Sequence, residues 1–296
     1  MSLVVTYRED DPMTTAFVLG GGGVLGAVEV GMLRALFERG IGPDLVLGTS
    51  VGALNGALVA RDPSLAVIDR LVELWRRAGE TRDVYGDRPL RTMRRAMSSR
   101  THIYSAGPLK ARLREELGDV TFEELPVRFQ VCAASIERAA EHWFDSGPVV
   151  DAVVASAAVP GLLPPAQVGD EHFLDGGIVN SIPLGRAVQL GATRVFVLQV
   201  GRIDRPLTVP TKPWEVARVS FEIARRHRFA RELAALPAGV EAHVLPAAGT
   251  SSRDDSLFAY RDFTRVQAKI DATYDACVRY LDEGSRQPRP PKEEGP

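Results

Sequence analysis

A serine lies between two glycines in the run GTSVG at residues 48–52. An apolar stretch at 45–47 precedes it, and a predicted helix made of small residues follows it. The pattern G-x-S-x-G between a strand and a helix is typical of a nucleophile elbow, which raises the serine hydroxyl to the helix N-terminus. A glycine-rich turn with a capping Ser or Thr has the same pattern without any chemistry. Ser50 is therefore a candidate nucleophile that needs support from the rest of the chain.

A second glycine-rich run, at residues 20–26, follows an apolar stretch and precedes a helical pattern. Gly21, Gly23 and Gly26 satisfy G-x-G-x-x-G, so a dinucleotide-binding fold has to be considered. That fold needs an acidic residue at the far end of the second strand, where it binds a ribose. Asp44 instead precedes the second strand, and no Lys-Ser/Thr pair follows Gly26 as a P-loop requires. Both nucleotide-binding interpretations are therefore disfavoured.

A glycine-rich turn at a helix N-terminus can also form an oxyanion hole, because backbone N–H groups without side chains can closely approach a developing alkoxide. The loops that follow parallel strands lie at the same edge of the sheet. The glycine run 20–26 and Ser50 each follow a predicted strand, so we expect them to share a crevice. This geometry favours acyl transfer over nucleotide binding.

A serine nucleophile needs a group that accepts its proton. Asp175 follows a short apolar strand and begins the turn Asp175-Gly176-Gly177, although Asp-Gly alone usually marks only a turn. The histidines do not lie in glycine-framed turns: His102, His142, His172, His227 and His243. A histidine triad that uses His172 or His243 remains an alternative.

Hydrophobic residues make up 45% of the 296 residues and charged residues 25%, which is typical of a globular protein with a full core. Periodicity predicts strands and helices in alternation, which favours an α/β fold. Strands are expected at 15–19, 45–47, 127–134, 142–144, 194–200 and 240–245, with a short strand and tight turn at 173–180. Helices are expected up to about residue 40 and at 63–78, 105–117, 148–158, 214–236 and 257–281.

The net charge of -2 and the pI near 6.3 give no global attraction to nucleic acid. Cys132 and Cys277 have no metal-ligand spacing and are expected to be reduced core residues. The N-terminus does not have the pattern of a signal peptide, and no run has the length and hydrophobicity of a membrane span. The expected location is the cytoplasm, with peripheral membrane contact left open.

A basic segment at residues 88–100 is predicted to form a short helix. Leu90, Met93 and Met97 fall on one face of it, and arginines fill the rest. Such a helix can lie on an anionic membrane surface or cover a lipid site. An ordinary solvated helix with a buried stripe has the same pattern.

Three stretches in order, at residues 21–26, 48–52 and 175–177, resemble the patatin-like phospholipases, a family of lipid acyl hydrolases with a serine–aspartate dyad. A fourth stretch, ASAAVPGLLPP at residues 155–165, is similar to the family segment before the aspartate. The resemblance covers roughly residues 14–200 and is specific because the motifs match jointly.

The resemblance implies a three-layer α/β sandwich with a mostly parallel central sheet flanked by helices. It implies Ser50 as nucleophile, Asp175 as base and an acyl-serine intermediate formed from a lipid or other ester, without a metal or organic cofactor. The backbone amides of Gly21, Gly22 and Gly23 would hold the oxyanion. Glycines that shape the site would be Gly48, Gly52, Gly176 and Gly177.

The domain organisation that we expect has a catalytic domain at 14–205 and a helix-strand-helix part at 206–282 packed on it, with a disordered tail at 283–296. The oligomeric state is left open. The chain departs from the family pattern at Leu25, where the family usually carries Arg or Lys. The change removes a positive charge beside the loop and favours a neutral or less charged ester. It also leaves a non-catalytic lipid-binding or regulatory protein as an alternative.

Overall fold

The structure is a computed structural model that describes residues 14–81, 101–200, 203, 206–248 and 266–284. Three expectations lie wholly or partly outside these residues. They are the basic segment at 88–100 with its Leu90, Met93 and Met97 face, the start of the last helix at 257, and most of the tail.

An eight-stranded sheet forms the centre of the protein, in the order β5-β6-β3-β2-β1-β7-β8, with β4 also paired to β3. Strands β3, β2, β1, β7 and β8 run parallel, whereas β4, β5 and β6 pair in antiparallel fashion. The bounds are β1 Thr15–Leu19, β2 Leu45–Thr49, β3 Arg128–Ser135, β4 Ala140–Phe144, β5 Ala166–Val168, β6 Glu171–Asp175, β7 Arg194–Leu198 and β8 Glu241–Val244.

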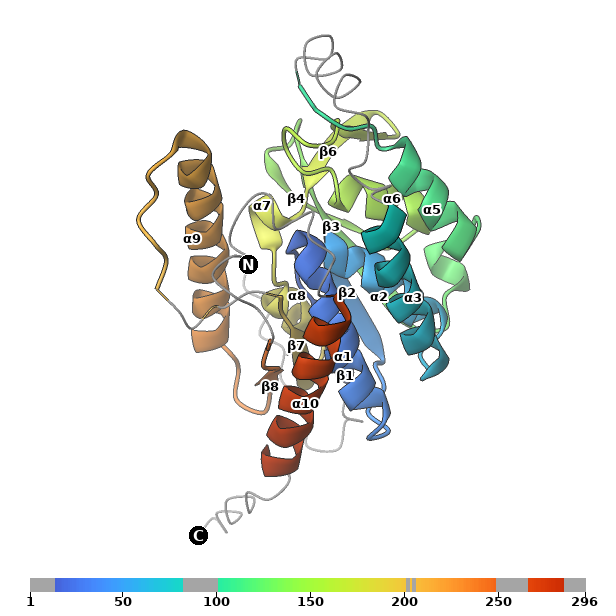
Figure 1. Ribbon diagram of the computed structural model, residues 1–296, viewed down its shortest axis with the longest axis vertical. Helices are drawn as coiled ribbons and strands as arrows, with labels where there is room; N and C mark the ends of the chain where they lie inside the picture. The colour runs from blue at the N-terminus through green and yellow to red at the C-terminus, as the bar shows by residue number, and fades with distance from the viewer. Residues whose placement is uncertain (1–13, 82–100, 201–202, 204–205, 249–265, 285–296) are drawn as a thin grey trace.

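Helices cover both faces of this sheet (Figure 1). The α-helices are α1 Ala27–Phe37, α2 Val51–Arg61, α3 Ala66–Thr81, α5 Gly107–Leu117, α6 Val149–Ser156, α7 Gly177–Asn180, α8 Leu184–Gln189, α9 Pro213–Ala234 and α10 Val266–Gly284. Short 3-10 turns lie at η1 Gly23–Gly26 and η2 Phe122–Glu124.

Side chains of β1 alternate between two cores. Phe17 and Leu19 pack with residues of α1, α2, α3, α5, α6 and α10, whereas Ala16 and Val18 pack with residues of α8 and with Phe229 of α9. A parallel strand covered on both faces needs a continuous apolar sequence, which explains the run TAFVL. The predicted three-layer α/β sandwich with a mostly parallel sheet is confirmed.

The C-terminal part joins the same sheet. Strand β8 extends the sheet beyond β7, and α10 runs along α1 (Figure 1). Arg39 at the end of α1 forms an ion pair of 2.7 Å with Asp282, and the Tyr274 hydroxyl donates to Glu38. In the described residues, no helix is long and apolar enough to cross a membrane.

The expected short strand and tight turn at 173–180 correspond to β6 followed by a helical turn. The strand ends at Asp175, and the short helix α7 begins at Gly177. The Asn180 N–H donates to the Gly176 carbonyl at 2.8 Å, so the tight turn is a single turn of helix. The short elements β5 and α8 were not expected. Cys132 and Cys277 are buried free thiols, as predicted.

Candidate active site

Ser50 occupies a strained backbone position between β2 and α2. Its φ of 56° and ψ of -123° lie in a region that side-chain-bearing residues rarely adopt. Such a conformation costs about 1–3 kcal/mol and clusters at functional sites. The flanking glycines permit the close packing of this elbow. A Cβ on Gly48 would lie 2.5 Å from the Ala53 Cα, and a Cβ on Gly52 would lie 2.3 Å from the Leu19 carbonyl oxygen.

The Ser50 hydroxyl donates a hydrogen bond of 2.5 Å to Oδ2 of Asp175. The other carboxylate oxygen, Oδ1, accepts the Gly177 N–H at 2.7 Å. Both members of the pair are buried, with 7% of Ser50 and 4% of Asp175 exposed. One oxygen is thus fixed by the backbone of the turn, and the other faces the serine. Ser50 and Asp175, singled out separately in the sequence, lie in direct contact.

Burial raises the pKa of the Asp175 carboxyl from 3.8 to about 6, although hydrogen bonds from Ser50 and Gly177 act in the opposite direction. A carboxylate with a raised pKa is a stronger base and is still mostly ionised at neutral pH. The pair therefore has the geometry and the basicity for proton transfer from the serine hydroxyl.

The end of α6 contacts the backbone of both residues. The Ser50 N–H donates to Oγ of Ser156 at 2.7 Å, and that hydroxyl donates to the Cys132 carbonyl at 2.6 Å. The Asp175 N–H donates to the Ala158 carbonyl at 3.0 Å. Ser156 was not singled out in the sequence as a functional residue. Its position in the stretch at 155–165, which is similar to a family segment, was the signal that could have found it.

The glycine-rich loop after β1 lies against Ser50. A Cβ on Gly21 would lie 3.3 Å from the Ser50 Cβ, and one on Gly22 would lie 1.8 Å from Cγ2 of Val200, so a side chain at Gly22 would have to displace Val200. The Gly21 N–H donates to the Ser181 carbonyl at 3.0 Å. Within the described part of the chain, the amides of Gly22 and Gly23 donate to no acceptor. These two amides are therefore unpaired in the loop that lies beside Ser50.

A buried polar cluster of Asn55, Glu29 and Trp75 contacts the end of this loop at Gly26. Asn55 of α2 donates through Nδ2 to the Gly26 carbonyl at 2.9 Å and to Oε2 of Glu29 at 2.7 Å. Its Oδ1 accepts the indole N–H of Trp75 at 3.2 Å. Burial raises the pKa of Glu29 well above its ordinary value, which favours the neutral acid. The cluster joins α1, α2 and α3 at the C-terminal end of the loop.

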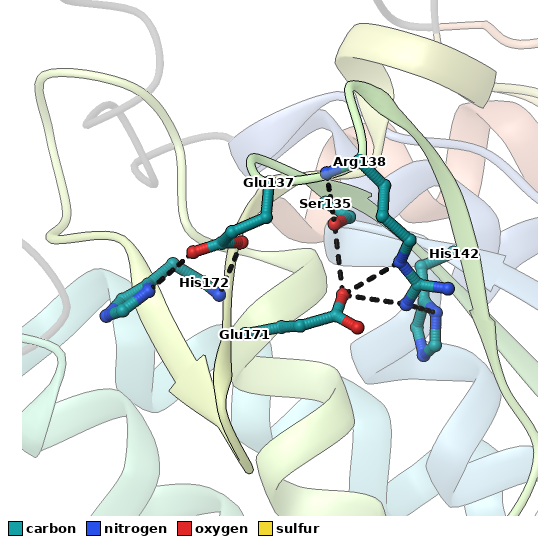
Figure 2. A network of polar contacts seen from close by, with 6 residues as sticks. All are labelled: Ser135, Glu137, Arg138, His142, Glu171 and His172. Atoms are coloured by element: carbon teal, nitrogen blue, oxygen red, sulfur yellow. Dashed lines mark hydrogen bonds and ion pairs between the residues drawn. The ribbon is translucent and has the colours of Figure 1, made fainter.

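The two histidines of the alternative triad contact other groups. The His172 ring contacts Oε1 of Glu137 at 2.8 Å, and its backbone N–H donates to the same carboxylate (Figure 2). The His243 ring stacks on Phe196, with ring centroids 4.9 Å apart. Neither histidine hydrogen-bonds to Ser50 or Asp175 in the part of the chain that the structure describes.

The network in Figure 2 anchors the strand that carries Asp175. Glu171, at the start of β6, accepts the Ser135 hydroxyl at 3.0 Å and forms an ion pair of 2.7 Å with Arg138. Arg138 also contacts the His142 ring at 2.7 Å. These contacts join the β3–β4 turn to the start of β6, and so fix the strand from the end opposite Asp175. The described residues hold no group of three His, Cys, Asp or Glu side chains that could bind a metal.

The sequence model of the patatin-like phospholipase family matches residues 17–188, which is more than half of the 296-residue chain. The chain therefore belongs to the patatin-like phospholipase family, as the resemblance of its motifs indicated.

Two curated relatives illustrate the match. "Lysophospholipase nte1" of Aspergillus terreus is 31% identical over 199 residues, which cover 64% of this chain and 12% of that protein. "Patatin-like phospholipase domain-containing protein ZK370.4" of Caenorhabditis elegans is 33% identical over 193 residues, covering 63% of this chain and 14% of the relative. The matched segment is thus a small part of these much longer proteins.

Two solved structures are similar at a more distant level. VipD from Legionella pneumophila gives a TM-score of 0.43 at 15% identity, covering 92% of this chain and 67% of that one. The type III effector protein ExoU gives a TM-score of 0.43 at 15% identity, with 94% and 54% covered.

Proposed function

We propose that the protein is a lipid acyl hydrolase that cleaves carboxylic ester bonds through a Ser50–Asp175 dyad. The observation that carries the proposal is the 2.5 Å hydrogen bond between the hydroxyl of a strained elbow serine and a buried carboxylate. A serine hydroxyl is a weak nucleophile until an adjacent base accepts its proton, and Asp175 is the base in contact with it.

In the proposed acylation, Ser50 Oγ attacks the ester carbonyl carbon while Oδ2 of Asp175 accepts the hydroxyl proton. The carbonyl oxygen becomes an oxyanion, and the free amides of Gly22 and Gly23 donate to it. Gly21 shapes the loop next to Ser50, since its own amide is bonded to Ser181. Collapse of the intermediate breaks the ester C–O bond, and Asp175 returns the proton to the leaving alcohol.

In the proposed deacylation, water attacks the acyl-Ser50 carbonyl and gives its proton to Asp175. The same amides hold the second oxyanion, and collapse releases the fatty acid as the proton returns to Ser50 Oγ. An acceptor alcohol in place of water would make the same steps a transacylation. The residues named supply both half-reactions, so the proposed steps need no further catalytic group.

The proposed substrate class is a lipid carboxylic ester, of the kind that phospholipases A and lysophospholipases cleave. The family membership and the name of the nte1 relatives support this class. Leu25, half-buried in the turn η1, packs against the hydrophobic core and brings no charge to the glycine-rich loop, which suits an ester without a strongly anionic head group. Such substrates lie in membranes or micelles, so peripheral contact with a lipid surface is part of the proposal.

Hydrolysis by the purified protein tests the function. Lysophosphatidylcholine and a soluble p-nitrophenyl ester are the substrates, and Ser50→Ala is compared with the surface variant Ser64→Ala. We expect Ser64→Ala to retain the wild-type rate and Ser50→Ala to lose it by at least about 10³-fold. Full activity of Ser50→Ala would contradict the proposal. So would a wild-type protein that binds lipid without cleaving it, which is the outcome that a lipid-binding or regulatory protein predicts.

A further inference from the structure

We infer that Ser156 is a positioning residue that holds Ser50 in its attacking conformation and couples it to the turn carrying Asp175. This inference rests on the proposed function. Ser156 has no exposed surface and cannot touch a substrate. Its effect on the reaction must therefore pass through the two residues that it holds.

The hydroxyl of Ser156 contacts the backbone of the nucleophile. Ser50 donates its N–H to this hydroxyl at 2.7 Å, and the side chain of Ser50 does not cap its own helix because it is bonded to Asp175. A positive-φ serine persists only where its surroundings fix it. The bond to Ser156 fixes the amide end of the residue, and the bond to Asp175 fixes the hydroxyl end.

The same hydroxyl is oriented by the sheet. It donates to the Cys132 carbonyl at 2.6 Å, so its proton is committed and a lone pair is left to accept the Ser50 N–H. Cys132 lies on β3, which pairs with β2 on one side and β6 on the other. Ser156 thus connects the Ser50 elbow to β3, the strand that lies between β2, which precedes Ser50, and β6, which ends at Asp175.

The backbone of Ser156 contacts the other half of the dyad. Its carbonyl accepts the Gly176 N–H at 3.2 Å, one residue after Asp175. A Cβ on Gly176 would lie 2.1 Å from the Cys132 carbonyl oxygen, so the turn and the strand are in close contact there. One residue therefore holds the nucleophile through its hydroxyl and the turn of the base through its carbonyl.

Replacing Ser156 with alanine should displace the nucleophile without removing any group that contacts the substrate. A misplacement of about 1 Å can cost roughly 10²-fold in rate. We expect Ser156→Ala to lower kcat on a soluble p-nitrophenyl ester by about 10- to 100-fold, with KM within about twofold of wild type. The rate of fluorophosphonate labelling should fall by a similar factor.

Thr273→Val is the matched control. The Thr273 hydroxyl of α10 is also buried, accepts a backbone N–H, from Ala248 at 3.2 Å, and donates to a backbone carbonyl, also of Ala248, at 2.9 Å. Neither contact involves Ser50, Asp175 or Gly176. A purely structural role for both hydroxyls predicts that the two variants lose thermal stability and activity in parallel. The positioning role predicts similar losses of stability but a large loss of kcat only for Ser156→Ala.

Ser156→Cys covers the case in which the alanine variant folds poorly. Cysteine preserves the shape and forms only weak hydrogen bonds, so kcat should lie between those of wild type and Ser156→Ala. In both variants the midpoint of the acidic limb of the pH–rate profile should stay close to that of the wild type, since the Asp175 carboxyl stays buried and keeps the bond from the Gly177 N–H.

Two results would overturn the inference. One is a kcat of Ser156→Ala within twofold of that of Thr273→Val. The other is a wild-type kcat in Ser156→Cys, together with a loss of activity in Ser156→Ala that its loss of folded protein accounts for. Failure of the proposed function would look different. In that case the wild type itself would be inactive, or Ser50→Ala would retain activity.

Discussion

The Ser50 hydroxyl and the Asp175 carboxylate, 125 residues apart in the chain, meet at 2.5 Å across strand β3. The sheet register brings this about. Thr49, just before the serine, pairs with Cys132, and Asp175 pairs with the next residue, Ala133. Two neighbouring residues of one strand thus set the separation of the proposed nucleophile and base.

The activity should depend on the ionisation of Asp175. Because burial raises its pKa to about 6, the fraction of ionised base grows as the pH rises through about 6. We expect kcat/KM for an uncharged soluble ester to increase through this range and to level off above it. A pH–rate profile measures this midpoint.

Histidine replacements control for a histidine that titrates in the same range. His172→Ala and His243→Ala should retain the midpoint and the plateau, because both rings hydrogen-bond or stack elsewhere. If kcat/KM of either variant no longer rose with pH through this range, a histidine would be favoured as the base. A midpoint near about 4, the ordinary pKa of an aspartate, would contradict a desolvated Asp175.

Asp175→Asn should be inactive and yet more stable at alkaline pH. Burial raises the pKa of Asp175 from 3.8 to about 6 in the folded protein. The folded protein therefore loses stability as the pH rises between these two values, because Asp175 must then ionise in a buried position. The full shift corresponds to about 3 kcal/mol of destabilisation above pH 6. Asparagine avoids this cost and can still accept the Gly177 N–H.

Urea unfolding of the wild type and Asp175→Asn near pH 5 and near pH 8 measures the difference. The advantage of the variant should be larger near pH 8, by on the order of 1 kcal/mol. An advantage that is equal at both pH values would mean that the carboxylate is not destabilised by burial.

Gly176→Ala should be strongly destabilising. Its Cβ would lie 2.1 Å from the Cys132 carbonyl oxygen, and a backbone atom in a central strand cannot move away cheaply. We expect a loss of at least about 3 kcal/mol in the free energy of unfolding. Gly42→Ala is the control, because no atom lies within 4 Å of its Cβ position, and it should change stability by less than about 0.5 kcal/mol. Equal effects of the two substitutions would refute the close contact at Gly176.

Asn55→Ala should cost more than Trp75→Phe in the free energy of unfolding. The first change leaves three groups, of Gly26, Glu29 and Trp75, without the hydrogen bonds that Asn55 makes to them. Unpaired buried polar groups cost about 1–3 kcal/mol each, so we expect about 3 kcal/mol or more. Trp75→Phe removes the indole bond to Asn55 and part of a core side chain, but it leaves the Asn55 bonds to Gly26 and Glu29 in place. Chemical denaturation ranks the two, and the opposite order would show that the cluster contributes little.

Much of the fold follows from the sequence because its central strands are apolar and covered on both faces. The strand at 15–19 was predicted with its full bounds, since the sheet buries every residue of TAFVL. The short elements β5 and α7 could not be found in this way. Three or four residues give no periodicity, and the start of α7 is closely packed through Gly176 and Gly177 against Cys132 and Phe221, which are distant in sequence.

Part of the candidate site was also within reach of the sequence. Glycine spacing made Ser50 and the turn at Asp175 candidates, because the flanking glycines leave no room for a side chain, and the family resemblance gave Asp175 its expected role as base. Two other contacts depend on tertiary packing between distant segments. The Gly21 N–H donates to the Ser181 carbonyl, and the Ser50 N–H donates to the Ser156 hydroxyl. No local pattern encodes such contacts.

Active-site labelling with a fluorophosphonate probe, with the labelled residue located by peptide mass spectrometry, tests the dyad most directly. The wild type should carry the label on Ser50, Ser50→Ala should remain unlabelled, and Asp175→Asn should label at least about 10²-fold more slowly. A label on another residue, or an unchanged labelling rate in Asp175→Asn, would contradict a nucleophile activated by Asp175.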